Sequence, residues 1–202
     1  MLDIINTFFL LFAVIDPIGT VPVFLSATQN FDVPEKKKIA VRASITAAII
    51  LIFFIVVGQL IIEGMEVTLD AFQISGGIIL FLFALTMIFG EGKPENEIHM
   101  IKDFKRVTIF PIAIPSIASP GAIMAVVLLT DNHMYSIGQQ AVTTFLMLIV
   151  VAITAVLLVV ARYIQSWIGE QGITVISKIM GLILASYATQ SILSGLKSFF
   201  MS

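Results

Sequence analysis

The stretch FAVIDPIGTVP, residues 12–22, lies inside the run 4–28, whose only charged residue is Asp16. The run is long enough to cross a bilayer, because about 20 apolar residues span the hydrocarbon core as a helix. Each of the two prolines in the stretch removes a backbone donor and clashes with the preceding turn, and the glycine between them adds backbone freedom. The stretch therefore predicts a membrane-spanning helix that is broken near its middle, at Asp16.

The rest of the chain contains five further uncharged runs of similar length. They cover residues 43–62, 71–90, 107–130, 134–161 and 179–196. Strands of a membrane barrel would alternate apolar and polar residues over about ten positions, whereas residues 49–57 are apolar throughout. We therefore predict an all-α integral membrane protein with six transmembrane helices.

The composition agrees with a membrane protein. Of the 202 residues, 58% are hydrophobic and only 12% are charged, against about 25% charged in an ordinary soluble domain, and the mean hydropathy is +1.06. These values exclude a soluble enzyme, and six spans leave no room for a sizeable domain outside the membrane. The absence of cysteine excludes disulfides and thiolate metal sites. A net charge of −2 gives no reason to expect nucleic acid as a partner.

The basic residues predict the orientation in the membrane. If the six spans alternate in direction, ten basic residues share one face: Lys36, Lys37, Lys38, Arg42, Lys93, Lys102, Lys105, Arg106, Arg162 and Lys178. Such loops stay in the cytoplasm. We therefore expect a multi-pass protein of the cell (inner) membrane, with residues 91–106 as a cytoplasmic connecting loop and both termini outside the cytoplasm.

The two halves of the chain resemble each other. A shift of about 103 residues superimposes the Asp16–Pro17 pair on Ser119–Pro120 and aligns the second and third spans with the fifth and sixth. Each half has three crossings, so the second half enters the membrane from the opposite side. This arrangement is typical of the 3+3 inverted repeats of secondary transporters. We predict a first repeat over residues 1–90 and a second, inverted repeat over residues 107–202.

The fourth span carries the counterpart of the first break, in the segment PSIASPG, residues 115–121. Both breaks fall near the middle of their spans, where freed backbone groups are tolerated only inside the protein or along a cavity. Opposed helix ends at such breaks suit a small dipolar or zwitterionic ligand. The candidate substrate-binding residues are those of the two breaks: Asp16, Pro17, Gly19, Thr20, Ser116, Ser119 and Gly121.

Asp16 has two possible roles. A charge in the hydrocarbon core costs about 2.5 to 3.5 kcal/mol, which favours a functional role: accepting a proton or cation as the ion-coupling residue, or pairing with a substrate ammonium group. Alternatively, Asp16 caps the half-helix that begins at Pro17. Ser116 and Ser119 likewise either contact a ligand or bond back to their own helix.

The remaining signals favour helix packing over chemistry. Gly76, Gly77 and Gly181 are expected to let the third and sixth helices pack closely against the broken ones. The chain has no Gly-x-Ser-x-Gly or His-Glu-x-x-His motif and no histidine within a span. We therefore expect no enzymatic activity, no cofactor and no metal site.

Three motifs resemble those of a known family. The segments FAVIDPIGTVPVFLS (12–26), FPIAIPSIASPGAI (110–123) and ISGG (74–77) are similar to the signature helices of the MarC family. The resemblance covers nearly the whole chain. It implies a six-helix inner-membrane protein whose relatives carry small neutral amino acids such as glycine and alanine.

The resemblance and the two breaks together lead to a functional expectation. We expect a proton- or sodium-coupled secondary transporter of small neutral amino acids of the glycine, alanine and serine class. Transport would follow from rocking of one half against the other around the midplane site. Two alternatives are an exporter of another small metabolite and a non-transporting assembly or regulatory membrane protein.

Overall fold

The computed structural model describes residues 4–64, 68–90 and 103–201. All regular secondary structure in these ranges is helical. Residues 91–102, which include Lys93, Lys102 and most of the predicted connecting loop, lie outside them. The elements are α1 (Ile4–Ile15), α2 (Thr20–Ala27), α3 (Val33–Gly64), α4 (Leu69–Phe89), α6 (Phe104–Val107), the π-helical segment η1 (Thr108–Ile117), α7 (Pro120–Leu129), α8 (Ile137–Val159) and α9 (Ala161–Met201).

The helices of the described ranges account for up to six membrane spans. Five helices are long and apolar enough to cross a membrane, and the pair formed by residues 104–117 and 120–129 makes a sixth if it is one broken span. This pair is bent by 56°. By contrast, Ile4–Ala27 qualifies as one span despite its interruption. The prediction of an all-helical, multi-pass membrane chain is confirmed.

The second spanning helix begins earlier than predicted, at Val33 and not at Ala43. Its start is fixed by a reciprocal cap outside the uncharged run. The Asp32 backbone N–H donates to Glu35 Oε2 at 3.0 Å, and the Glu35 N–H donates to Asp32 Oδ1 at 2.8 Å. Counting uncharged residues missed this start, because an uncharged run marks the apolar part of a helix and not the ends of the helix.

The last two spans also differ from the predicted bounds. A capping box between Ser136 and Gln139 starts α8 after its predicted first residue. α9 is interrupted at Gly169, whose φ of 74° is a conformation that glycine adopts without steric cost. Its spanning part, Gln171–Met201, is longer than the predicted run 179–196. The helix continues past Lys178 and Lys197, because charges near a span's ends do not stop a helix.

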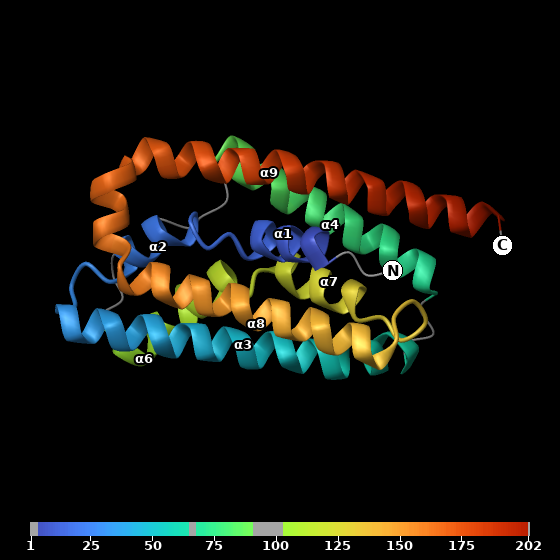
Figure 1. Ribbon diagram of the computed structural model, residues 1–202, viewed down its shortest axis with the longest axis horizontal. Helices are drawn as coiled ribbons and strands as arrows, with labels where there is room; N and C mark the ends of the chain where they lie inside the picture. The colour runs from blue at the N-terminus through green and yellow to red at the C-terminus, as the bar shows by residue number, and fades with distance from the viewer. Residues whose placement is uncertain (1–3, 65–67, 91–102, 202) are drawn as a thin grey trace.

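The helices form three layers (Figure 1). α4 and α9 pack on each other along one side of the molecule, and α3 and α8 pack on each other along the opposite side. The interrupted helices lie between these pairs: α1 contacts α8 and α9, η1 contacts α3, and α7 contacts α3 and α4. Both interruptions therefore lie in the middle layer, between the two outer pairs.

Glycines set the close packing of α4 against its neighbours. A Cβ on Gly77 would lie 3.0 Å from the Ala188 carbonyl, and one on Gly181 would lie 3.0 Å from the Ala84 carbonyl. A Cβ on Gly76 would instead meet a side chain of α7 at 2.8 Å. Gly76 thus packs against a broken helix as predicted, whereas Gly77 and Gly181 bring α4 and α9 against each other.

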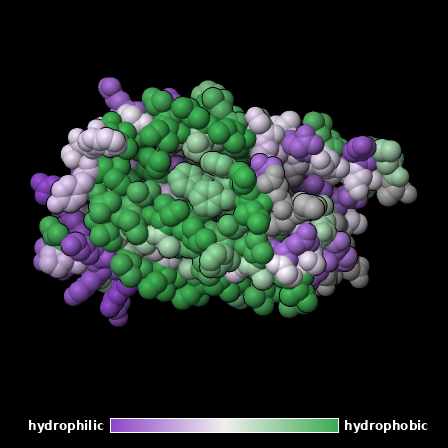
Figure 2. Space-filling view, viewed as in Figure 1, coloured by the Kyte–Doolittle hydropathy of each residue, from purple (hydrophilic) through white to green (hydrophobic). Residues whose placement is uncertain are grey.

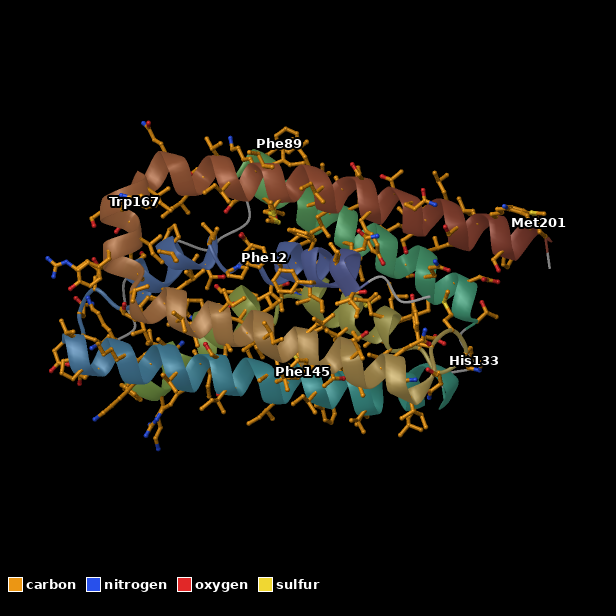
Figure 3. All side chains as sticks on the ribbon, in the orientation of Figure 1. Phe12, Phe89, His133, Phe145, Trp167 and Met201 are labelled. Carbon is orange, nitrogen blue, oxygen red and sulfur yellow. The ribbon has the colours of Figure 1, made fainter. Side chains whose placement is uncertain are left out.

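The outer surface has the pattern of a membrane protein. Figure 2 shows apolar residues across the middle of the molecule and hydrophilic residues gathered toward its ends. The starts of α3, α6 and α9, which carry most of the described basic residues, lie at one end. Trp167 lies at this end and His133 at the opposite one (Figure 3). We call the first of these the basic end.

Candidate functional site

The first interruption is a short turn between α1 and α2. Asp16 adopts a φ of 47°, in the left-handed region that Asp and Asn tolerate better than most residues. Its carboxylate Oδ1 accepts the Gly19 backbone N–H at 2.9 Å. Its carbonyl accepts the backbone N–H and the hydroxyl of Thr20, at 3.0 and 2.9 Å. The Asp16 carboxylate therefore bonds the turn of residues 17–19, whereas α2 begins at Thr20, three residues later than the half-helix predicted to start at Pro17, with Gly19 as its N-cap and no side-chain cap bond.

The second interruption has a side-chain helix cap. η1 ends at Ile117, α7 begins at Pro120, and Ser119 between them has extended backbone. Ser119 Oγ accepts the Ala122 backbone N–H at 3.0 Å. This bond joins residue i to residue i+3, as the bond from Gly19 to Asp16 does. The two residues that the sequence repeat places in register thus each accept a backbone N–H three residues further on, although only Ser119 is the N-cap of its helix.

The fourth span is also irregular before this point. Phe110 and Ile114 within η1 have non-helical backbone angles, and each precedes a cis proline, Pro111 or Pro115. The sequence predicted an irregular segment from Pro115 onward. The structure extends it by five residues toward the basic end.

Two hydrogen bonds join the interruptions to each other. Ser119 Oγ donates to the Val14 carbonyl at 3.2 Å. The Ser116 carbonyl, 3.4 Å from Thr20 Oγ1, shares the hydroxyl proton that Thr20 donates to the Asp16 carbonyl. The half-helices cross here, because α1 contacts α7 and α2 contacts η1. We call this region the crossing. Carbonyl groups that the breaks free from helical bonding are thus bonded by hydroxyls of the opposite break.

The crossing is closed to solvent. The exposed fraction is 6% for Asp16, 1% for Thr20 and 0% for Ser119. A carboxylate, two hydroxyls and several backbone carbonyls thus meet in a buried volume at the centre of the bundle. Such a group combines one negative charge with hydrogen-bond donors and acceptors, as a zwitterionic ligand requires.

The last helix contributes to the same region. Ser177 Oγ of α9 lies 3.5 Å from Asp16 Oδ1 and donates to it. A Cβ on Gly19 would overlap the Asp16 carboxylate and lie 2.5 Å from Ser177 Oγ. Only glycine at position 19 therefore leaves room for the carboxylate between α2 and α9.

The structure brings most of the predicted residues together. Asp16, Gly19, Thr20, Ser116 and Ser119 meet at the crossing, and Pro17 lies buried within the first turn. Gly121 has a different environment, because a Cβ there would lie 2.9 Å from the Phe83 ring of α4. Its contact is helix packing, one turn away from the crossing.

Sequence reasoning assigns no role to Ser177. The segment around it is similar to ISGG (74–77) in the first half. That similarity could have indicated that it approaches a broken helix. Because Ser177 lies far from the prolines in the sequence, its contact with Asp16 could not be predicted.

The acid Asp131, in the connection between α7 and α8, is buried. It follows α7, its exposed fraction is 4%, and its Oδ1 accepts the His133 backbone N–H at 2.7 Å. His133 Nδ1 lies 3.4 Å from the same oxygen. Partial burial and the nearby Asp131 charge raise the pKa of the Tyr135 phenol. These contacts order the connection between α7 and α8.

Comparison with known proteins assigns the chain to a family. Residues 1–200 match the family model described as MarC family integral membrane protein. The chain belongs to the MarC family. The resemblance expected from the proline-containing segments is thus confirmed, and with the apolar helices it makes this MarC protein a multi-pass integral membrane protein.

Relatives of this MarC protein occur in bacteria and archaea. It is 34% identical to the UPF0056 membrane protein YvbG of Bacillus subtilis, over 98% of this chain and 95% of the relative. It is 35% identical to the UPF0056 membrane protein PH0760 of Pyrococcus horikoshii, over 99% of each, and 32% identical to MJ1677 of Methanocaldococcus jannaschii, over 93% and 92%. These names describe membrane proteins without naming a substrate. No solved structure matches the chain.

Proposed function

We propose that this MarC protein is a secondary transporter of small neutral amino acids, with the crossing as its substrate site. The observation that carries the proposal is the buried Asp16 carboxylate, which lies among hydroxyls and carbonyls where two interrupted helices meet. An intramembrane carboxylate is costly and marks substrate or ion pathways in membrane proteins.

The site chemistry fits an amino acid. A substrate ammonium group would pair with the Asp16 carboxylate, and its carboxylate would replace the Val14 and Asp16 carbonyls as the acceptor of the Ser119 and Thr20 hydroxyl protons. The tight packing at Gly19, where the Asp16 carboxylate and Ser177 occupy the position of a Cβ, favours a substrate with a small side chain, as in glycine, alanine or serine. Protonation of Asp16, or Na⁺ bound beside it, would couple transport to an ion gradient.

An inverted 3+3 repeat is part of this proposal, and the helix ends support it. At each break a side chain accepts the backbone N–H three residues further on. In addition, Thr28 and Thr130 end the two broken spans with hydroxyls that donate four residues back at 2.7 Å. A reciprocal cap follows each of them, at Asp32 in the first half and at Ser136 in the second. Equivalent positions thus repeat the same local structure.

The helix contacts support the same relationship. α3 packs on its counterpart α8, α4 packs on its counterpart α9, and each half of the first broken helix packs on the opposite half of the other. α3 and α8 run in opposite directions (Figure 1). These are the contacts expected of two halves related by an axis in the membrane plane. We further propose that the basic end faces the cytoplasm of a cell-membrane protein.

Counterflow in proteoliposomes tests the transport proposal. Purified protein should exchange labelled glycine, alanine or serine saturably, with uptake stimulated by an imposed proton or sodium gradient. The substitution Asp16→Asn should reduce exchange by about tenfold or more, because a charge-assisted hydrogen bond contributes about 1.5 to 3 kcal/mol. The control Asp32→Asn, at an exposed helix cap, should leave exchange unchanged. Absence of both binding and exchange would refute the substrate assignment.

Experiments can distinguish two other functions from amino-acid transport. An exporter of another small metabolite would use the same crossing, and a panel of labelled metabolites in the same counterflow assay would reveal it. A non-transporting assembly or regulatory protein is favoured by one observation, the mutual hydrogen bonding of the two breaks. In that case no solute would exchange, and hydrogen exchange at the crossing would be as slow as in the core of α3.

A further inference from the structure

A second polar site lies at the basic end, away from the crossing. It is a groove between α3, α6 and η1 with a volume of about 270 Å³. Two basic residues on different elements line it, Arg42 of α3 and Lys105 of α6. Ile45 and Ile109 form its apolar wall, with exposed fractions of 54% and 52%. The groove therefore joins a cationic rim to an apolar, outward-facing surface.

The two cationic groups are available to a ligand. The Arg42 guanidinium carbon lies 5.3 Å from the centre of the Phe104 ring, which holds the group by a cation–π contact. The Asp103 carboxylate accepts the Lys105 backbone N–H at 2.9 Å. Within the described ranges, neither Arg42 nor Lys105 forms an ion pair. The groove thus presents two positive charges without a described anionic partner.

The threonines of the groove are hydrogen-bond acceptors toward a ligand. Thr46 Oγ1 donates to the Arg42 carbonyl at 2.9 Å, and Thr108 Oγ1 donates to the Phe104 carbonyl at 2.7 Å. Each hydroxyl proton is therefore used within its helix, and the oxygen lone pairs remain. A ligand that complements the groove carries a negative charge for the cations and hydroxyl groups for these oxygens.

We propose that this groove binds the headgroup of an anionic glycerophospholipid with a hydroxylated headgroup, as in phosphatidylglycerol. The phosphate lies between Arg42 and Lys105, the headgroup hydroxyls donate to the threonine oxygens, and the acyl chains lie along Ile45 and Ile109. Basic pockets between spanning helices at the membrane surface bind anionic lipids in this way. The apolar wall selects a lipid over a soluble phosphate. The site does not depend on the transport proposal.

Native mass spectrometry of the delipidated full-length protein tests this site. Titration with phosphatidylglycerol and with phosphatidylcholine gives the preference for the anionic lipid. The double variant Arg42→Gln with Lys105→Gln should lose about 25-fold in that preference, at about fivefold for each basic residue. The matched control, Lys37→Gln with Arg162→Gln, removes the same charges from exposed positions outside the groove. It should retain the preference within about twofold.

Three further measurements distinguish lipid binding from binding of a soluble phosphate and from general charge attraction. Phe104→Leu keeps both charges but removes the ring beneath Arg42, and should weaken phosphatidylglycerol binding several-fold; unchanged binding would overturn the placement of the phosphate beside Arg42. Glycerol 3-phosphate should not displace the lipid; equal binding of both would overturn the lipid assignment in favour of a soluble phosphate. Equal losses in the groove variant and in the matched control would show general charge attraction, and would also overturn the proposal.

Discussion

Asp16 combines three properties that conflict in most proteins. It is acidic, it is buried within an apolar bundle, and its backbone is left-handed. Each property has a cause in its immediate surroundings: the Gly19 N–H and the Ser177 hydroxyl bond its carboxylate, and the turn before Pro17 sets its backbone. These bonds explain how the residue is tolerated but do not explain why an acid is found there.

Two substitutions at this position separate the cap from the charge. Asp16→Asn keeps a side-chain oxygen for the Gly19 N–H, and asparagine caps helices about as well as aspartate. Asp16→Ala removes the cap and should cost about 1 kcal/mol more in the free energy of unfolding. Thermal unfolding in detergent measures this difference, while both variants should lose transport. Full transport activity in Asp16→Asn would limit the residue to a capping role.

Gly19→Ala tests the space between Asp16 and Ser177. The added Cβ would overlap the Asp16 carboxylate, so we expect a loss of about 1 to 3 kcal/mol in stability from overpacking. Gly138→Ala is the control, because a Cβ there meets nothing within 4 Å. That variant should be neutral or slightly stabilising. Equal melting temperatures for the two variants would contradict the packing described at the first interruption.

At the scale of elements, α4 and α9 form the tightest helix pair. A Cβ on Gly181 would lie 3.0 Å from the Ala84 carbonyl and 2.9 Å from Met87 Cβ. Gly181→Ala should therefore lower the stability of the detergent-solubilised protein by about 1 to 3 kcal/mol, as measured by thermal unfolding. Gly64→Ala, where a Cβ meets nothing within 4 Å, should have little effect. A melting temperature unaffected by Gly181→Ala would mean that the two helices are farther apart.

The helices also show which features of the fold could be predicted from the sequence and which could not. Prolines fix where a helix is interrupted, so both breaks could be predicted from composition along the chain alone. Helix starts outside the apolar runs depend on caps such as that of Asp32, which hydropathy does not detect. The contact of Ser177 with Asp16 joins residues 161 positions apart, and only the packing of α9 on α2 brings them together. Local rules predicted the site residues of the breaks, while the helix that covers them required the tertiary structure.

At the scale of the whole molecule, the orientation in the membrane is open to a direct test. The native chain has no cysteine, so the reactivity of a single introduced cysteine reports the accessibility of that position alone. Lys37→Cys, at the start of α3, should react with a membrane-impermeant maleimide only after cells are permeabilised. Gly138→Cys, at the start of α8, should react in intact cells. The reverse result would place the basic end outside the cytoplasm.

The layered packing bears on how such a bundle could open. Each outer layer contains one helix from either half of the sequence, so the boundary between residues 1–90 and 107–202 runs through both layers. A rotation of one half against the other would slide α4 along α9, where glycines hold the backbones in contact. Sliding of the α4–α9 pair over the interrupted helices keeps those backbone contacts and shifts contacts with side chains, such as that of Gly76 with Met124 and that of Gly121 with Phe83. We therefore expect the mobile unit to be the α4–α9 pair, which contains one helix from each half of the sequence. This pair would move over the crossing.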